Sequence, residues 1–145
     1  MLFSLIPPPR AHSEVIIGCY FYVWYDEGWG SRHWNDSISN IVVDTPSYYN
    51  YYSSQNVTHL RKQIKLMKDV GVDFVIISWW GNNGYEDNAT LRFIDANIEE
   101  NLPLKFCIII EPYTGSINYT FVYYYIYDHY ASPYSSIYVK WRGYP

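Results

Sequence analysis

Apolar and polar positions along the chain predict strands and helices in turn. A continuous apolar and aromatic run covers residues 14–25, EVIIGCYFYVWY, and its β-branched start is typical of a strand buried on both faces. Shorter apolar runs at 72–78 and 104–110 predict a second and a third buried strand. The stretch from 26 to about 53 is rich in Gly, Asn and Ser and is expected to be a long loop.

Three helices are predicted to follow these strands. The first is expected to begin at a Ser54 cap and to end at Gly71, with basic residues on its outer face. Its apolar positions recur at three- and four-residue steps and are Val57, Leu60, Ile64, Met67 and Val70. A second helix is expected between an Asn88 cap and Pro103, with an apolar face formed by Leu91, Ile94 and Ile98. The third covers about 119–130, with tyrosine and isoleucine on its buried side.

This order of elements predicts an α/β fold with a parallel sheet and right-handed crossovers. A doubly wound sheet and a (β/α)₈ barrel both fit the order, and in both the functional loops follow the carboxyl ends of the strands. Residues 1–13 contain three consecutive prolines and are expected to form a loose tail, with the folded part at 14–145. The last residues, YVKWRGYP, are typical of a lead-in to a fourth strand.

Composition narrows the class of function. The chain has 145 residues, enough for one domain, and its net charge of -4 argues against nucleic acid, which favours a basic face. Aromatic residues make up 21% of the chain, and tyrosine and tryptophan suit half-exposed binding surfaces. No apolar run approaches the ~20 residues of a membrane span, and no signal peptide is evident, so a cytoplasmic location is the default expectation. Cys19 and Cys107 are expected to be buried free thiols, although a disulfide stays open.

Carboxylates beside aromatic side chains are the most distinctive chemistry in the sequence. It contains no glycine-rich phosphate loop, no metal-ligand spacing and no G-x-S-x-G motif, so no cofactor and no metal are expected. Glu111 comes directly after the third strand, and its side chain is expected to point into a pocket at the edge of the sheet. Glycoside hydrolysis uses two carboxyl groups, so these loops favour a carbohydrate site. The other candidate carboxylates are Asp26, Glu27, Glu86 and Asp87.

Five groups of segments, in order, resemble glycoside hydrolase family 99, the endo-α-1,2-mannosidase type. They are YFYVWY at 20–25, RHWN at 32–35, YYSSQ at 51–55 with the HL and QIK that follow, GVDFV at 71–75 with SWWG at 78–81, and IEPY at 110–113. They cover nearly all of residues 16–145. The resemblance implies a (β/α)₈ barrel that cleaves internal α-mannosidic linkages with retention and needs no cofactor.

The resemblance also implies which residues bind sugar. It assigns this role to the aromatic segment after the first strand, to the histidine of the His-Trp pair, to the Ser-Trp-Trp segment and to the glutamate of Glu-Pro-Tyr. The expected substrate-binding residues are Tyr22, Tyr25, His33, Trp34, Trp79, Trp80, Glu111 and Tyr113. Side chains alternate along a strand, so one of Trp79 and Trp80 is expected to face the site and the other to pack; the sequence leaves open which, and likewise for Tyr22 and Tyr25.

Two departures from the family shape the expected activity. Gly115 is followed by Ser116 where the family usually has arginine, and no two glutamates are three residues apart, so the catalytic Glu-x-x-Glu pair is missing. A complete barrel typically needs ~250 residues. We therefore expect the amino-terminal part of a mannosidase-like barrel, with about three β/α units, inactive alone and partnered by a missing carboxyl-terminal barrel fragment. A non-catalytic carbohydrate-binding or interaction module, and more distantly a domain associated with glycosyl transfer, are the alternatives.

Overall fold

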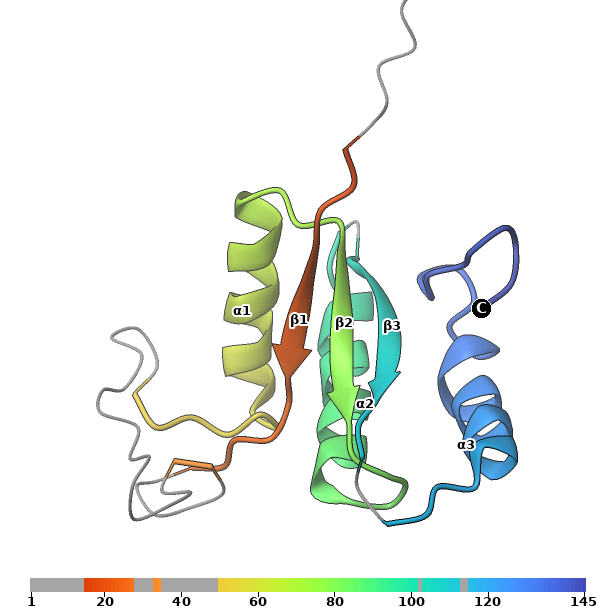
Figure 1. Ribbon diagram of the computed structural model, residues 1–145. Coiled ribbons are helices and arrows are strands. Elements are labelled where there is room, and N and C mark those ends of the chain that lie inside the picture. Colours follow the sequence, from red (N-terminus) through yellow and green to blue (C-terminus); the bar gives the residue numbers. More distant parts are fainter. Residues whose placement is uncertain (1–14, 28–32, 35–49, 102, 113–114) are drawn as a thin grey trace, which may run out of the picture.

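A parallel sheet with helices on one face forms the centre of the molecule. The computed structural model describes residues 15–27, 33–34, 50–101, 103–112 and 115–145. Within these residues the sheet has three strands in the order β1-β2-β3, all parallel (Figure 1). They are β1 (Gly18–Tyr22), β2 (Phe74–Trp79) and β3 (Lys105–Ile110). The parallel sheet predicted from the sequence is confirmed.

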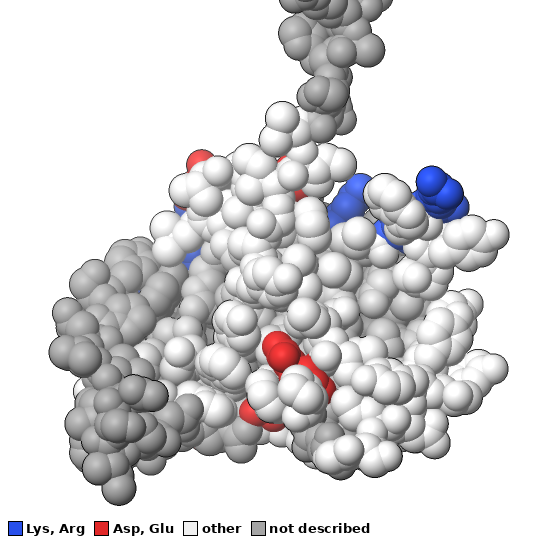
Figure 2. All heavy atoms as spheres, in the orientation of Figure 1, with Lys and Arg blue, Asp and Glu red and all other residues white. Residues whose placement is uncertain are grey.

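The helices alternate with the strands along the chain. They are α1 (Val57–Asp69), α2 (Tyr85–Ile98) and α3 (Tyr119–Ile126), and α3 continues into the π-helical turn η1 (Tyr127–Ala131). In Figure 1, α1 lies beside β1, α2 lies behind the strands and α3 stands beyond β3, so the opposite face of the sheet is open toward the viewer. Figure 2 shows that this open face is mainly uncharged, with acidic groups near the ends toward which the strands point.

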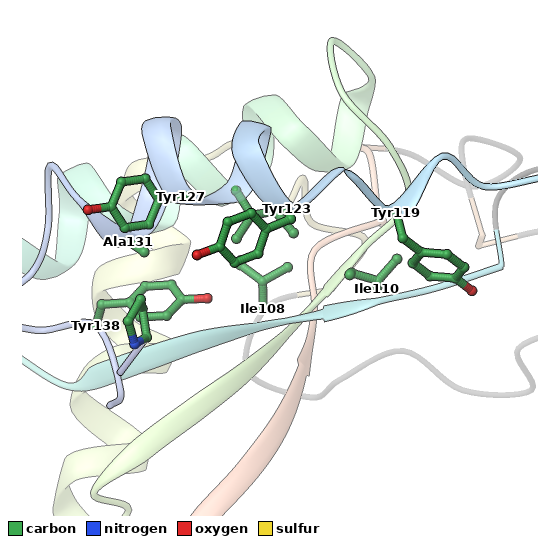
Figure 3. Close-up of a pocket in the computed structure, with 9 residues that line it drawn as sticks. Ile108, Ile110, Tyr119, Tyr123, Tyr127, Ala131 and Tyr138 are labelled. Atoms are coloured by element: carbon green, nitrogen blue, oxygen red, sulfur yellow. The ribbon is translucent and has the colours of Figure 1, made fainter. Parts of the chain in front are cut away.

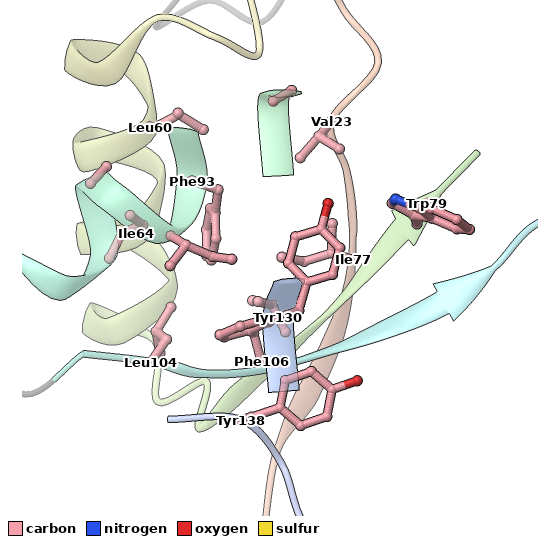
Figure 4. Packing of buried hydrophobic residues seen from close by; sticks show 14 of the residues in the cluster. Val23, Leu60, Ile64, Ile77, Trp79, Phe93, Leu104, Phe106, Tyr130 and Tyr138 are labelled. Carbon is pink, nitrogen blue, oxygen red and sulfur yellow. The ribbon is translucent and has the colours of Figure 1, made fainter. Parts of the chain in front are cut away.

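The core lies between the sheet and the helices. Alternation along β2 and β3 turns Val75, Ile77 and Phe106 toward the helices, where they are fully buried. They meet apolar side chains of α1 and α2 (Figure 4), namely Leu60, Ile64, Phe93 and Ile94. Full burial of such a side chain is worth roughly 1.5–3 kcal/mol, so this layer holds the three units together.

One expectation about burial is wrong and another holds only in part, for the same physical reason. The first strand was expected to be buried on both faces, but Tyr20 is 60% exposed because no described residue covers the open face of the sheet. The third helix was expected to have tyrosine and isoleucine on its buried side: Tyr130 is fully buried, whereas Tyr123 and Tyr124 are exposed, and Val122 is the buried residue of α3 itself. Both elements carry apolar faces for which the described chain offers no second layer.

Both predicted helix caps are also wrong. Asn56 caps α1, and its side-chain oxygen accepts hydrogen bonds from the backbone N–H groups of Thr58 and His59 at 3.0 and 3.3 Å. The Ser54 hydroxyl instead accepts from the backbone N–H of Tyr25, in the loop after β1, at 3.1 Å. Helix α2 begins before Asn88, which lies exposed inside it, because Glu86 and Asp87 place negative charge in its first turn.

The chain returns to the sheet after η1. The backbone N–H of Phe106 donates to the carbonyl of Ile137 at 2.9 Å, and the N–H of Val139 donates to the carbonyl of Phe106 at 2.8 Å. These two bonds form a single parallel bridge between Phe106 and Tyr138 on the free side of β3. The expected lead-in to a fourth strand is therefore present, and the chain then turns at the pairing of Trp141 with Tyr144.

Two smaller expectations can be compared with the structure. Cys19 and Cys107 are both free and half-buried, so the reading as free thiols is confirmed over the disulfide. Within the described residues, no helix is long and apolar enough to cross a membrane. The expected amino-terminal tail, 1–13, lies outside the described residues.

Candidate functional site

Three candidate side chains meet where the parallel strands end. The register pairs Tyr22 with Ser78 and Ser78 with Ile109, so the residues two positions further on stand at one level. These residues are Trp24, Trp80 and Glu111. Because side chains alternate along a strand, all three belong to the open face, the face away from α1 and α2.

A hydrogen-bonded relay connects β2 with Glu111. The indole Nε1–H of Trp80 donates to the Ser78 hydroxyl oxygen at 3.0 Å, and the Ser78 hydroxyl donates to Oε1 of Glu111 at 2.9 Å. Ser78 is only 1% exposed, so its hydroxyl is held between these two partners and fixes both. The backbone N–H of Glu111 also donates to the carbonyl of Trp79 at 3.0 Å, which ties the carboxylate to the end of the sheet.

An aromatic wall stands beside this relay. The ring of Trp24 stacks on Tyr22 with centroids 4.5 Å apart and on His33 with centroids 4.7 Å apart. Trp80 lies 6.1 Å from Trp24 in a tilted arrangement. The indole Nε1 of Trp24 is buried and has no hydrogen-bond partner among the described residues. The wall therefore places aromatic rings next to a fixed carboxylate.

His33 reaches this wall through an uncommon backbone conformation. Its φ angle is 59°, in the left-handed region that residues other than glycine adopt rarely. Such a conformation persists where surrounding contacts hold it, and here the ring is stacked on Trp24 and meets Tyr25 edge-on at 6.4 Å. The imidazole is thus held against the wall.

A second aromatic group lies next to the wall and is packed inward. Tyr25 lies against Trp34 in a tilted arrangement with centroids 4.2 Å apart, and Trp34 is almost fully buried. The indole Nε1–H of Trp34 donates to the carbonyl of Tyr52 at 3.1 Å. The backbone of Tyr25 pairs with Ser54 in both directions, at 2.7 and 3.1 Å. These contacts fasten the loop after β1 to the segment before α1.

Trp79 belongs to the core on the helix side. Its Nε1–H donates to Oδ1 of Asp87 at 2.7 Å, and both residues are buried. Asp87 also accepts from the hydroxyls of Tyr125 and Tyr130. Burial raises the pKa values of both tyrosines above the ordinary value, and the bonds to Asp87 raise them further. Asp87 therefore connects α2 with α3 and η1.

The structure thus groups the eight expected binding residues unevenly. It brings Tyr22, His33, Trp80 and Glu111 to one edge, whereas Tyr25, Trp34 and Trp79 pack elsewhere. Tyr113 lies outside the described residues.

Sequence reasoning missed two members of the site, Trp24 and Ser78. The alternation of side chains along a strand could have identified both residues. Trp24 follows Tyr22 by two positions and Ser78 precedes Trp80 by two, so each pair lies on one face of the sheet.

The remaining candidate carboxylates have other partners. Glu27 accepts a hydrogen bond from the side-chain amide of Asn56 at 3.2 Å, and Asp26 accepts from the N–H of Glu27 at 2.9 Å. Glu86 and Asp87 are buried in the first turn of α2. No group of three His, Cys, Asp or Glu in the described part of the chain is placed to hold a metal ion.

Two solved structures have a fold similar to that of this chain. The fold matches the GH99 endo-alpha-mannosidase from Bacteroides thetaiotaomicron in complex with BIS-TRIS-propane, with a TM-score of 0.70 and 24% identity over 89% of this chain and 40% of that chain. A second structure of the GH99 endo-alpha-mannosidase from that organism gives a TM-score of 0.66 and 22% identity over 88% of this chain and 43% of that chain. The chain folds like part of a GH99 enzyme. No family model and no curated protein matches the sequence.

The comparison confirms the expected fold class and shows how much of the matching structures this chain covers. The chain spans about two fifths of the length of the GH99 structures that it matches. Its three β/α units are therefore an incomplete portion of that glycoside-hydrolase fold, as the resemblance implied.

Proposed function

We propose that the chain is the amino-terminal part of a GH99-like barrel and that its open strand ends bind α-mannosides. The relay from Trp80 through Ser78 to Glu111 carries this proposal. A sugar ring presents C–H groups on its faces and hydroxyls on its rim. Trp24 and Trp80 provide flat partners for the faces, and the Glu111 carboxylate provides a strong acceptor for the hydroxyls.

The proposed role of Glu111 is binding and not catalysis. Retaining glycoside hydrolysis needs two carboxyl groups ~5–5.5 Å apart. The glutamates of the chain, at 14, 27, 86, 99, 100 and 111, contain no pair spaced like the Glu-x-x-Glu of the family. We infer that the catalytic pair belongs to a missing carboxyl-terminal part of the barrel and that the chain alone does not cleave its ligand.

A carbohydrate-binding module without catalysis is the second candidate. The continuous core between the sheet and α1 and α2 favours it, because such a core supports a chain that folds alone. The two candidates make the same prediction for binding and different ones for assembly. A barrel portion gains hydrolysis when the rest of the barrel is supplied, whereas a module does not.

Calorimetric titration of the chain with α-1,2-mannobiose tests the binding proposal. Glu111→Gln keeps the shape and removes the charge, and Trp80→Ala removes a ring face; each is expected to weaken binding about tenfold, equivalent to ~1.4 kcal/mol. The control is Trp141→Ala, because Trp141 is 77% exposed and lies after η1, outside the site.

A thermal melt with and without the disaccharide provides the second readout. Binding to the folded state alone raises the midpoint, and this rise should be absent in Glu111→Gln. A folded chain that shows neither heat of binding nor a shift with the disaccharide would refute the proposal.

A further inference from the structure

We propose that Asn83 is a site of spontaneous chemical modification, at which the side-chain amide is lost through a cyclic imide formed with the backbone nitrogen of Gly84. The products are aspartate and isoaspartate at position 83. The two residues lie in the turn that joins the end of β2 to α2, next to the strand ends (Figure 1). This inference goes beyond the proposed function and is independent of sugar binding.

The sequence offers one favourable place for this reaction. Asn83–Gly84 is the one pair in the chain in which glycine follows asparagine. The reaction requires the backbone nitrogen of the following residue to reach Cγ of the asparagine. A side chain on that following residue crowds the approach, and glycine has none. The other asparagines are all followed by residues that carry a side chain, so the chemistry favours Asn83.

The fold leaves both reacting groups accessible. Asn83 is exposed, and its φ angle of 57° lies in the left-handed region that asparagine tolerates in turns. Gly84 is the N-cap of α2, so its nitrogen lies outside the hydrogen-bond ladder of the helix. Among the described residues, neither the N–H of Gly84 nor the side-chain amide of Asn83 forms a hydrogen bond. The two groups can therefore meet without breaking a hydrogen bond of their own.

The reaction needs water and no other reactant. The Gly84 nitrogen gives up its proton and bonds to Cγ of Asn83, while the bond from Cγ to the amide nitrogen breaks and ammonia leaves. Water then opens the imide at either of its carbonyl carbons. Attack at Cγ restores the ordinary peptide bond and leaves aspartate. Attack at the backbone carbonyl carbon leaves isoaspartate, whose main chain runs through the former side chain and is longer by a methylene.

Isoaspartate would disturb the anchoring of α3. The backbone N–H of Asn83 donates to Oδ2 of Asp87 at 2.9 Å, and the carbonyl of Gly84 accepts from the N–H of Asn88 at 3.2 Å. These two bonds lie on either side of the altered linkage, so a longer main chain cannot keep both at their present geometry. Asp87 also accepts from two tyrosine hydroxyls of α3 and η1. The modified turn therefore loosens α3 from α2.

The space between α3 and β3 gives this loosening a second readout. An apolar pocket of about 340 Å³ lies there, lined by Ile108 and Ile110 of β3 and by tyrosine and isoleucine side chains of α3 and η1 (Figure 3). Movement of α3 away from β3 would expose this lining. An apolar fluorescent dye such as ANS, which binds exposed hydrophobic surface, should therefore bind more strongly to the reacted chain than to the fresh chain.

Incubation of the full chain in mildly alkaline buffer tests the site. Mass spectrometry of proteolytic fragments follows the loss of amide at each asparagine. Asn83 should react at least about tenfold faster than Asn88, which is also exposed but is followed by alanine inside α2. The rate at Asn83 in the folded chain should lie within about tenfold of its rate in urea, because an open turn gives little protection. Reaction at Asn83 only after unfolding would overturn the proposal.

Two variants separate the reaction from its effect. A Cβ at Gly84 would lie 3.6 Å from Oε2 of Glu86 and 3.9 Å from the carbonyl of Gly81, both ordinary contacts. Gly84→Ser therefore fits the turn, provides a favoured N-cap and should slow the reaction at least about tenfold. Asn83→Asp supplies the new charge without the extra methylene. Chain enriched in isoaspartate should melt at least about 3 °C below fresh chain, and Asn83→Asp should melt within about 1 °C of it.

The opposite results would overturn the inference. An unchanged rate of amide loss in Gly84→Ser would overturn Asn83 as a site that depends on its glycine. An unchanged midpoint and unchanged dye binding in the reacted chain would overturn the loosening of α3. Equal changes in Asn83→Asp and in the reacted chain would overturn the role given to the longer main chain. No sugar is present in these measurements, so their outcome is separate from the test of binding.

Discussion

Asp87 is the polar centre of the buried layer. Its carboxylate accepts from the indole of Trp79, from the hydroxyls of Tyr125 and Tyr130, and from the backbone N–H of Asn83 at 2.9 Å. These donors come from the end of β2, the turn before α2, α3 and η1. A buried carboxylate is stabilised only where hydrogen bonds replace water, and here four donors do so. Asp87 thus holds α3 to the rest of the molecule.

Substituting Asp87 should therefore have a large effect. Asp87→Asn keeps the volume but turns one acceptor oxygen into an NH₂ donor that faces other donors. The free energy of unfolding is expected to fall by about 3 kcal/mol, at the upper end for a hydrogen bond to a charged group. Urea unfolding followed by circular dichroism measures this, with the exposed Asp128→Asn as control. An equal loss in both variants would contradict the role given to Asp87.

At the residue scale, the sequence predicts which side chains lie at a strand end better than it predicts the direction in which each one points. Glu111 could be placed at the strand end because the apolar run of β3 stops immediately before it. Trp79 and Trp80 could not be distinguished, since both follow the same run. The choice depends on Asp87, a residue in the first turn of α2 whose carboxylate accepts a hydrogen bond from the indole of Trp79. A partner eight positions away leaves no periodic signal near the tryptophans.

At the scale of elements, helix starts show the same dependence on partners. Ser54, Asn56 and Asn88 are all residue types that favour a cap. Asn56 is the cap because Ser54 is already bonded to the backbone of Tyr25, across the loop after β1. The helices themselves were predictable from their three- and four-residue periodicity, but their first residues depend on contacts between distant segments.

Asn56 and Asn88 provide a matched test of this account. Asn56→Ala removes the acceptor of two backbone N–H groups and is expected to cost about 1 kcal/mol of stability. Asn88→Ala replaces an exposed residue inside α2 with the best helix former, so stability should stay the same or rise slightly. Midpoints of urea unfolding compare the two variants directly. A loss for Asn88→Ala as large as that for Asn56→Ala would show that the caps are assigned wrongly.

At the scale of the whole molecule, the order of elements was predictable and their burial was not. Periodicity shows that β1 has apolar side chains on both faces, but it carries no information on whether a second layer is present. The open face leaves Tyr20 and Tyr22 exposed, and the edge beside α3 leaves Tyr123 and Tyr127 exposed. These are the surfaces that the rest of a barrel would cover, so this mismatch is what an incomplete portion of that fold should show.

Buried tyrosines also give the whole molecule a predictable response to alkali. Burial raises the pKa of Tyr138 to about 12, and burial together with Asp87 raises the pKa values of Tyr125 and Tyr130. In the unfolded chain a tyrosine loses its proton near pH 10, so above that pH the unfolded state holds fewer protons than the folded one. The contribution of these tyrosines to stability is complete below about pH 10 and is lost as pH rises toward 12 and beyond.

A series of urea unfolding curves between about pH 8 and pH 12 measures this loss, with tyrosinate absorbance as a second signal. The free energy of unfolding should be level at first and should fall steadily above about pH 10. Tyr138→Phe removes one of the groups responsible, so its decline should be shallower. Tyr144→Phe, at a ring that is 76% exposed, is the matched control. A curve that stays level to pH 12 would mean that these rings are reached by water, and that the packing of η1 and the returning chain against β3 is not as described.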